Sequence, residues 1–214
     1  MARMVTNQEI AVADNSDSGR ATPFVILASA SPRRQELLRQ IGVSFRVLEP
    51  EVDEAPGKNE SGDAFVLRLA LEKARIGLSM AREQGLEAAP VVGADTCIVV
   101  DREILGKPND REHGIAMLAR LAGRSHRVLT GVAVVTASRE QHSVSLNRVT
   151  FASMTQSEIE AYWETGEPAD KAGAYAIQGR AAAYIERIEG SYSAIVGLPL
   201  FVVARMLKNL GMNL

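Results

Sequence analysis

Two adjacent arginines are the residues of this 214-residue chain whose type and placement most directly suggest chemistry. An apolar run over residues 24–28 predicts a buried strand, and Ser31 and Pro32 after it predict the start of a helix. Arg33 and Arg34 fall in the first turn of that helix, where cations are unfavourable because free backbone N–H groups already make this end positive. A bound anion would remove the cost, and guanidinium groups beside free N–H groups are typical of a phosphate site. The alternative is that both arginines extend into solvent.

A carboxylate interrupts the strongest strand signal in the chain, because Asp95 lies within the apolar run 91–100. Burying a carboxylate is costly unless it is paired, bound to a metal or open to a cleft. One interpretation is a buried Asp that accepts bonds from a helix start or an arginine. The interpretation we favour is a metal ligand or general base at the bottom of a pocket. Gly93, two residues earlier, permits the close approach of another chain or a ligand.

Four further side chains have both a structural and a functional interpretation. Taken alone, Lys73 and Lys107 suggest a solvated helix face and an exposed loop lysine. Glu54 lies in an expected loop over residues 49–62, which carries several acids and is typical of a solvated surface. An acidic loop beside arginines is also suited to holding a divalent cation against a polyphosphate. The amide of Gln178 offers a donor and acceptors for a nucleobase edge, or it is an ordinary edge-strand amide.

Strand-like and helix-like segments alternate along the chain and predict an α/β fold with a mixed sheet. Expected helices cover residues 32–41, 63–83, 110–121 and 199–210, and another helix starts at the capping box of Thr155 and Glu158. Expected strands cover residues 24–28, 43–48, 91–100, 104–105, 126–137, 143–154, 172–178 and 183–188. We expect residues 1–23 to form a flexible N-terminal arm. Residues 24–214 are expected to form one domain with two lobes, divided near residues 123–125.

Composition and charge exclude several classes of protein. The formal net charge of -2 argues against broad binding to nucleic acid or a membrane surface. A single cysteine, Cys97, excludes an internal disulfide and indicates a reducing compartment, so we expect a cytoplasmic protein. We identify neither a membrane-spanning run nor a secretory signal. The chain also lacks the GxxxxGK[ST], GxSxG and GxGxxG motifs, so a polyphosphate would have to be bound by another arrangement.

Six segments together resemble the Maf family of nucleoside triphosphate pyrophosphatases, over residues 24–210. They are Ser29-Ala30-Ser31-Pro32-Arg33-Arg34, Glu72-Lys73-Ala74, Gly93-Ala94-Asp95-Thr96, Gly106-Lys107-Pro108, His126-x-Val128-x-Thr130-Gly131-Val132, and Gly190-Ser191-Tyr192 through Val196-Gly197-Leu198-Pro199. The resemblance implies cleavage between the α and β phosphates of a nucleotide, giving a monophosphate and pyrophosphate. It also implies an elongated mixed sheet flanked by helices, with two lobes around a cleft, similar to inosine triphosphate pyrophosphatases.

The resemblance further implies roles for individual residues. By this resemblance, the triphosphate is bound by Arg33, Arg34, Lys73 and Lys107. A divalent cation (Mg²⁺ or Mn²⁺) is held by Glu54 and Asp95, and Asp95 also accepts a proton. The specificity for the base depends on Arg33, Thr96 and Gln178. The segment 170–179 is similar to that of the family branch that acts on dTTP and UTP. The resemblance also implies a homodimer, a role in keeping unwanted nucleotides out of nucleic acids, and a link to cell-division arrest. A 7-methyl-GTP pyrophosphatase and a nucleotide-binding division regulator with incidental turnover remain alternatives.

Overall fold

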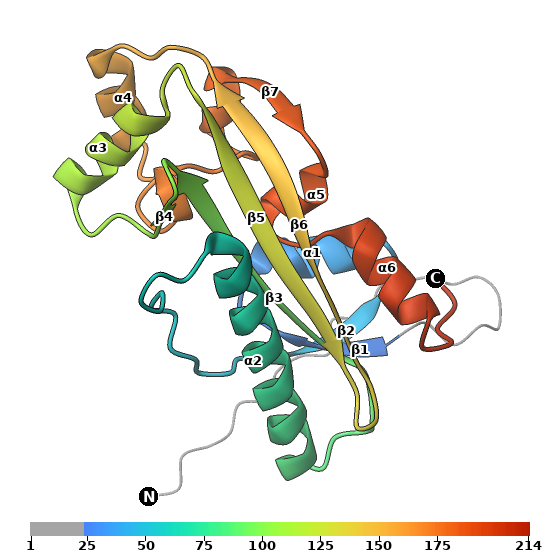
Figure 1. The fold of residues 1–214 in the computed structure, drawn as a ribbon. Coiled ribbons are helices and arrows are strands. Elements are labelled where there is room, and N and C mark those ends of the chain that lie inside the picture. The colour runs from blue at the N-terminus through green and yellow to red at the C-terminus, as the bar shows by residue number, and fades with distance from the viewer. Residues whose placement is uncertain (1–23) are drawn as a thin grey trace, which may run out of the picture.

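The computed structural model describes residues 24–214, and the predicted flexible arm over residues 1–23 lies outside the described residues. The strands are β1 (Phe24–Ala28), β2 (Ser44–Leu48), β3 (Val91–Val100), β4 (Glu103–Leu105), β5 (Ser125–Val135), β6 (Glu140–Phe151) and β7 (Ile185–Glu189). They form one 7-stranded mixed sheet in the order β2-β1-β3-β5-β6-β7, with β4 paired to β3 outside this path (Figure 1). The sheet confirms the predicted α/β class and the predicted hairpin of two long strands, β5 and β6.

The two edges of β3 are paired differently, and this difference creates room for a site. β5 pairs antiparallel with almost the full length of β3. On the other edge, β1 pairs only with the first two residues of β3, and β4 pairs only with residues 98–100. Residues 93–97 therefore form an open stretch of strand edge between β1 and β4. Asp95 and Thr96 both lie in this open stretch.

Helices cover both faces of the sheet, because buried side chains alternate between the two faces along each strand. The helical segments are α1 (Pro32–Gln40), α2 (Gly62–Glu83), α3 (Arg111–Leu121), α4 (Gln156–Trp163), the short turns η1 (Ala172–Ala174) and η2 (Arg180–Tyr184), α5 (Tyr192–Val196) and α6 (Leu200–Lys208). On one face, α2 packs Ala70 and Ala74 against Ala133 of β5. On the other, α1, α5 and α6 pack against one end of β3 and β5, while α3 and α4 pack against the opposite end.

Two glycines let α2 lie directly against the sheet. A β-carbon at Gly93 of β3 would lie 2.3 Å from the carbonyl oxygen of Ala70, and one at Gly131 of β5 would lie 2.2 Å from that of Val66. Such distances are far below van der Waals contact, so only glycine fits at either position. The segment that approaches Gly93 is therefore α2 of this same chain. Gly131 is also the register partner of Asp95 across the β3–β5 pair.

The chain between α4 and β7 differs from the prediction. The strand predicted over residues 172–178 is wrong, because this stretch contains the short turn η1 and then irregular backbone. Gly173 and Ala174 have φ values of 67° and 60°, and left-handed backbone at two successive residues cannot continue a strand. The strand predicted over residues 183–188 is found as β7, shifted by one or two residues because η2 occupies its predicted start. The short helix α5 was not predicted.

Candidate active site

A cavity of about 1050 Å³ lies beside the open edge of β3. It is lined by all the candidate residues from the sequence: Arg33, Arg34, Glu54, Lys73, Asp95, Thr96, Lys107 and Gln178. These side chains come from α1, the loop after β2, α2, β3, the loop after β4 and the irregular segment after η1. The fold therefore brings together segments that are far apart in the sequence, in a cavity of the size that small-molecule ligands occupy.

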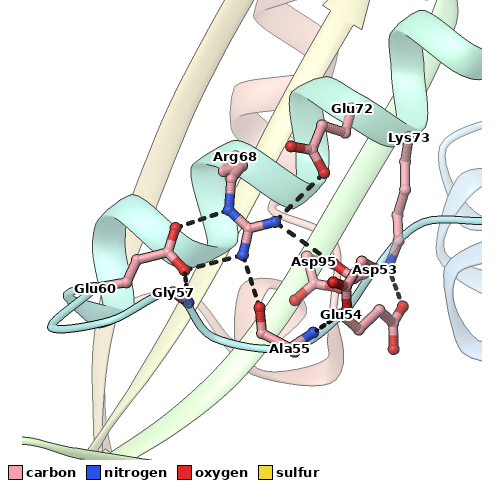
Figure 2. Close-up of polar contacts among 9 residues, drawn as sticks. All are labelled: Asp53, Glu54, Ala55, Gly57, Glu60, Arg68, Glu72, Lys73 and Asp95. Atoms are coloured by element: carbon pink, nitrogen blue, oxygen red, sulfur yellow. Dashed lines mark hydrogen bonds and ion pairs between the residues drawn. The ribbon is translucent and has the colours of Figure 1, made fainter.

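Lys73 of α2 bridges two carboxylates in the wall of this cavity. Its Nζ donates to Glu54 Oε1 at 2.6 Å and to Asp95 Oδ1 at 2.7 Å (Figure 2). Lys73 and Asp95 are buried, whereas the Glu54 side chain is 54% exposed. Mutual pairing offsets the cost of removing these charges from water. The solvated helix face that Lys73 suggested when taken alone is therefore wrong.

Glu54 is held in its charged form by the cations around it. Burial by itself would raise the pKa of this carboxyl, whereas the hydrogen bond and the charge of Lys73 lower it. The charges of Lys107 and Arg34 act in the same direction, so the net pKa lies below the usual range. The loop acid thus faces a concentration of positive charge and is not part of a simple solvated surface.

Arg34 is fixed inside the cavity wall by groups of two other segments. Its Nε donates to the carbonyl oxygen of Gly197 at 2.9 Å, and its Nη1 donates to Ser29 Oγ at 3.0 Å. Burial lowers the pKa of the Arg34 guanidinium, and the charge of Asp95 opposes that shift. The Ser29 hydroxyl also accepts from the backbone N–H of Ser31 at 3.3 Å. Helix α1 does begin after Ser31 as predicted, but the side chain of Ser31 forms no capping bond.

Arg33 and Lys107 complete the set of cations around the cavity. Both line it, and neither has a carboxylate partner within 4.0 Å among residues 24–214. Lys107 lies close enough to Glu54 to lower the pKa of that carboxyl. The pKa of Asp170 is lowered mainly by its hydrogen bond with Lys171, and the charge of Arg33 adds to this shift. Arg33 and Lys107 thus lack a local carboxylate partner among the described residues and line the same cavity as the buried Lys73, which indicates a site for an anionic ligand.

The hydroxyl of Thr96 presents only acceptor capacity to the cavity. Thr130 Oγ1 donates its single proton to the carbonyl oxygen of Ala194 at 2.7 Å. The 3.0 Å contact between the hydroxyls of Thr96 and Thr130 must then use the proton of Thr96. A ligand group that meets Thr96 is therefore expected to be a hydrogen-bond donor.

Gln178 reaches the cavity from a segment held by a glutamate and a tyrosine. Glu167 accepts from the hydroxyl of Tyr162 at 2.6 Å and from the backbone N–H of Arg180 at 2.9 Å. The Tyr162 oxygen in turn accepts from the backbone N–H of Ala176 at 3.3 Å. The backbone is thus held on both sides of Gln178. Sequence reasoning missed Glu167 and Tyr162, because a glutamate next to a turn and a tyrosine on a helix carry no distinctive spacing.

Comparisons with known proteins agree with this arrangement. The family model described as Maf-like protein matches residues 24–210. The chain belongs to the Maf family. It is 56% identical over 186 residues to the dTTP/UTP pyrophosphatase of Alkalilimnicola ehrlichii, covering 86% of this chain and 92% of that protein. The dTTP/UTP pyrophosphatase of Methylococcus capsulatus is 46% identical over 189 residues, covering 88% of this chain and 92% of its own.

Two solved structures resemble this Maf protein weakly. Protein VC0702 from Vibrio cholerae has a TM-score of 0.35 and 14% identity, covering 58% of this chain and 62% of its own. The Ham1 protein of Staphylococcus aureus has a TM-score of 0.38 and 12% identity, covering 60% and 70%. Similarity at this level carries no information about the site.

His126 of this Maf protein lies behind the cavity rather than in it. It is 3% exposed, and its Nε2 lies 2.8 Å from the hydroxyl of Tyr175, which lines the cavity. Burial lowers the pKa of His126 to about 4, so the ring is neutral at neutral pH. Phe151 packs against Tyr175 with ring centroids 4.9 Å apart. By these contacts His126 is a packed residue that supports the cavity wall.

The carboxylates of the cavity suit a divalent cation only together with phosphate oxygens. Within residues 24–214, no group of three or more His, Cys, Asp and Glu side chains is arranged to hold a metal ion. Glu54 and Asp95 nevertheless meet at one point, the Nζ of Lys73. Mg²⁺ is commonly bound through one or two carboxylates, with waters and substrate phosphates completing its coordination. The residues present therefore fit a cation that arrives with a polyphosphate.

Proposed function

We propose that this Maf protein is a nucleoside triphosphate pyrophosphatase that hydrolyses dTTP and UTP to the monophosphate and pyrophosphate. The observation that carries the proposal is the buried Lys73–Asp95 pair in a cavity with several further cations. The identity of 46% to 56% with proteins named dTTP/UTP pyrophosphatase supports both the reaction and the pyrimidine substrates. Modified pyrimidine nucleotides would fit the same site.

The cations of the cavity would bind the triphosphate. We assign this role to Arg33, Arg34, Lys73 and Lys107, all of which line the cavity. A nucleoside triphosphate carries about four negative charges, so positioning and charge neutralisation make up most of the catalytic task. The planar guanidinium groups are suited to paired bonds with phosphate oxygens, whereas the lysines act as point charges.

Glu54 and Asp95 are the residues that would hold a divalent cation, Mg²⁺ or Mn²⁺. The fit of their oxygens and the general use of divalent metals by Maf nucleotide pyrophosphatases support this assignment. Such a cation, when bound, neutralises charge on the phosphate oxygens. Lys73 keeps the two carboxylates together against their mutual repulsion until the substrate binds.

Asp95 would accept the proton of the attacking water. Its Oδ1 accepts from Lys73, and its Oδ2 has no hydrogen-bond partner among the described residues, so one oxygen is available as a base. A bond then forms between the water oxygen and the α phosphorus, and the bond from that phosphorus to the α–β bridging oxygen breaks. The charge that develops on the leaving pyrophosphate is stabilised by the surrounding arginines and lysines.

Base recognition is assigned to Gln178 and Thr96, with Arg33 between the base and the phosphates. Uracil and thymine present two carbonyl acceptors on either side of one N–H donor. The Gln178 amide can both donate and accept, and Thr96 offers an acceptor for a donor group. We also propose that residues 24–214 act as one domain with two lobes; a homodimer and a cytoplasmic location stay predictions. The described residues contain no helix that is long and apolar enough to cross a membrane.

Pyrophosphate release from a panel of nucleotides tests the proposal. The panel contains dTTP, UTP, CTP, ATP, GTP and 7-methyl-GTP, each with Mg²⁺, with Mn²⁺ and with chelator. We expect metal-dependent release from dTTP and UTP. Release from 7-methyl-GTP alone would retain the reaction but overturn the role of Gln178. If the folded protein binds nucleotides without metal and releases no pyrophosphate, it is a nucleotide-binding regulator instead.

A further inference from the structure

The loop that carries Glu54 has only short-range hydrogen bonds of its own, such as that from the backbone N–H of Ala55 to Asp53 Oδ1 at 2.9 Å, and these do not join it to the rest of the fold. It connects β2 to α2 over residues 49–61, and its residues 53–59 are all exposed. It contains no helix or strand. A single bond to Lys73 would not by itself fix a half-exposed carboxylate on such a loop, because ordering each backbone residue costs conformational entropy. Other contacts must hold the backbone around Glu54.

One arginine of α2 supplies these contacts. The Arg68 Nη2 donates to the carbonyl oxygen of Ala55 at 3.1 Å, and its Nη1 donates to that of Asp53 at 3.5 Å (Figure 2). These two carbonyl groups flank Glu54 on either side. The same helix therefore bonds the side chain of Glu54 through Lys73 and its neighbouring backbone through Arg68.

Arg68 is itself held in place by two glutamates. Its Nε and Nη2 donate to the two carboxylate oxygens of Glu60 at 2.8 Å and 2.9 Å, and its Nη1 donates to Glu72 at 3.4 Å. Glu60 also accepts from the backbone N–H of Gly57 at 2.8 Å, which ties the far side of the loop to the same group. The hydrogen bond from Arg68 lowers the pKa of Glu60 to about 2. The pair therefore stays ionised throughout the neutral range.

Arg68 does not line the cavity, so it does not touch a bound nucleotide directly. Its five donors lie in a planar fork, and the contacts described above use all three of its nitrogens. A lysine at this position would keep the charge but could not span Glu60 and both carbonyl groups at once. The geometry of the guanidinium, rather than its charge alone, matches the loop.

We propose that Arg68 is a positioning residue for the reaction, which holds the Glu54 carboxylate beside Lys73 and Asp95 so that it can bind the divalent cation. This inference rests on the proposed function and adds a residue that acts on the metal site through the loop. Removing Arg68 should then weaken the use of the cation without removing any group that contacts the triphosphate.

The chain offers a matched control on the same helix. Arg75 also forms a two-bond pair with a glutamate, Glu140, at 2.9 Å and 2.7 Å, but it makes no contact with the loop. Comparing Arg68→Ala with Arg75→Ala therefore separates loss of an α2 arginine–glutamate pair from loss of the loop contacts. Arg68→Lys tests whether charge alone is sufficient.

The first measurement is the Mg²⁺ concentration that gives half-maximal pyrophosphate release from saturating dTTP. We expect roughly a tenfold increase for Arg68→Ala, since outer partners of metal ligands commonly contribute that much to metal use. Arg75→Ala should match the wild type, and Arg68→Lys should recover only part of the loss. In a Glu54→Gln background, Arg68→Ala should cause no further change in this Mg²⁺ requirement, because both residues act through one carboxylate. Additive effects in the double variant would overturn the proposal.

The second measurement is hydrogen exchange of the backbone amides of residues 51–60, which requires no activity. Exchange should become faster in Arg68→Ala and remain unchanged in Arg75→Ala. Equal exchange in both variants would overturn the proposed positioning. If the wild type releases no pyrophosphate from any nucleotide, the proposed function fails, and this exchange experiment alone still decides whether Arg68 holds the loop.

Discussion

Two parts of the cavity lining, named the phosphate end and the base end after their proposed roles, are constructed in different ways. The end that we assign to the phosphates consists of Arg34, Lys73 and Asp95, which extend from α1, α2 and β3 and lie in buried or partly buried positions. The end that we assign to the base is the irregular segment 170–181, which is held by local bonds to Glu167 and Tyr162. Arg34, Lys73 and Asp95 are therefore fixed by regular elements of the core, whereas Gln178 lies on an irregular segment held by a few hydrogen bonds. Thr96, which we also assign to the base, lies on β3, and Glu54 lies on a loop.

The largest effect is expected from Asp95→Asn at the phosphate end. An amide keeps the size of the side chain but cannot accept a proton or carry charge, so kcat should fall by on the order of 10³ for every nucleotide. Pyrophosphate release from dTTP and UTP measures this loss, and circular dichroism provides the control for folding. Full activity in the folded variant would show that Asp95 is not the proton acceptor, and another residue would have to take this role.

Lys73→Met tests how strongly the phosphate end is coupled to the core. The substitution leaves Asp95 buried without its cation, and breaking a buried ion pair costs roughly 3–5 kcal/mol. Urea unfolding should report a loss of about 3 kcal/mol in the free energy of unfolding. A second substitution, Asp95→Asn, should recover part of that loss. If Lys73→Met is as stable as the wild type, the buried ion pair does not couple the phosphate end to the stability of the core, and in this respect the phosphate end does not differ from the base end.

Gln178→Ala is the corresponding test at the base end. It removes hydrogen bonds to the base without touching the buried charges, so kcat/KM should fall by about 10- to 100-fold for dTTP and UTP. Nucleotides with other bases should be less affected, so the preference for dTTP and UTP over them, expressed as a ratio of kcat/KM values, becomes smaller. The measurement is kcat/KM for each nucleotide with the wild type and the variant. A uniform loss for all nucleotides would make Gln178 part of the phosphate end.

The pH dependence of the free energy of unfolding tests the packing of His126 behind Tyr175, which lines the cavity. The pKa of His126 is about 4 in the folded chain, below its ordinary value of about 6.5, so only the unfolded chain takes up a proton between these values. Stability is therefore fully present above pH 6.5 and is lost as the pH falls toward 4. Between pH 7 and pH 5 the loss from this group should be about 2 kcal/mol.

Urea unfolding at pH 7, 6 and 5 measures this dependence. In His126→Gln the slope attributable to this residue should disappear, even if the variant is less stable at every pH. His142→Gln, which changes an exposed histidine on β6, should keep the wild-type slope. An unchanged slope in His126→Gln would mean that the acid sensitivity has another origin.

Sequence patterns predicted the phosphate end better than the base end, for physical reasons. Arg34 and Asp95 are noticeable because charge at a helix start or within an apolar strand conflicts with local energetics. The importance of Lys73 and Glu54 depended on the family resemblance, because their bond joins residues 19 positions apart, and this separation carries no periodic signal. The roles that we assign to all of these residues stay predictions.

The base end was predicted poorly because its backbone does not follow a period. Residues 172–178 form a short, mostly apolar run that suits a buried strand, yet Gly173 and Ala174 adopt left-handed conformations. Their conformation depends on tertiary bonds such as those of Glu167, which no local pattern contains. Arg68 escaped notice for a related reason, since its partners are backbone carbonyl groups of a loop.

The contact of α2 with Gly93 and Gly131 has a consequence for engineering. With no side chain between helix and sheet at these points, any side chain larger than glycine would push α2 away from the sheet and displace Lys73 and Arg68 with it. A library that randomises α2 or β3 should therefore yield unfolded variants before it yields new reactions. Within residues 170–181, Ala174, Tyr175 and Ala181 pack into the core, whereas Gln178 and its partly exposed neighbours can be exchanged without removing a buried contact of the sheet. New nucleotide selectivity is best sought there, with the scaffold left unaltered.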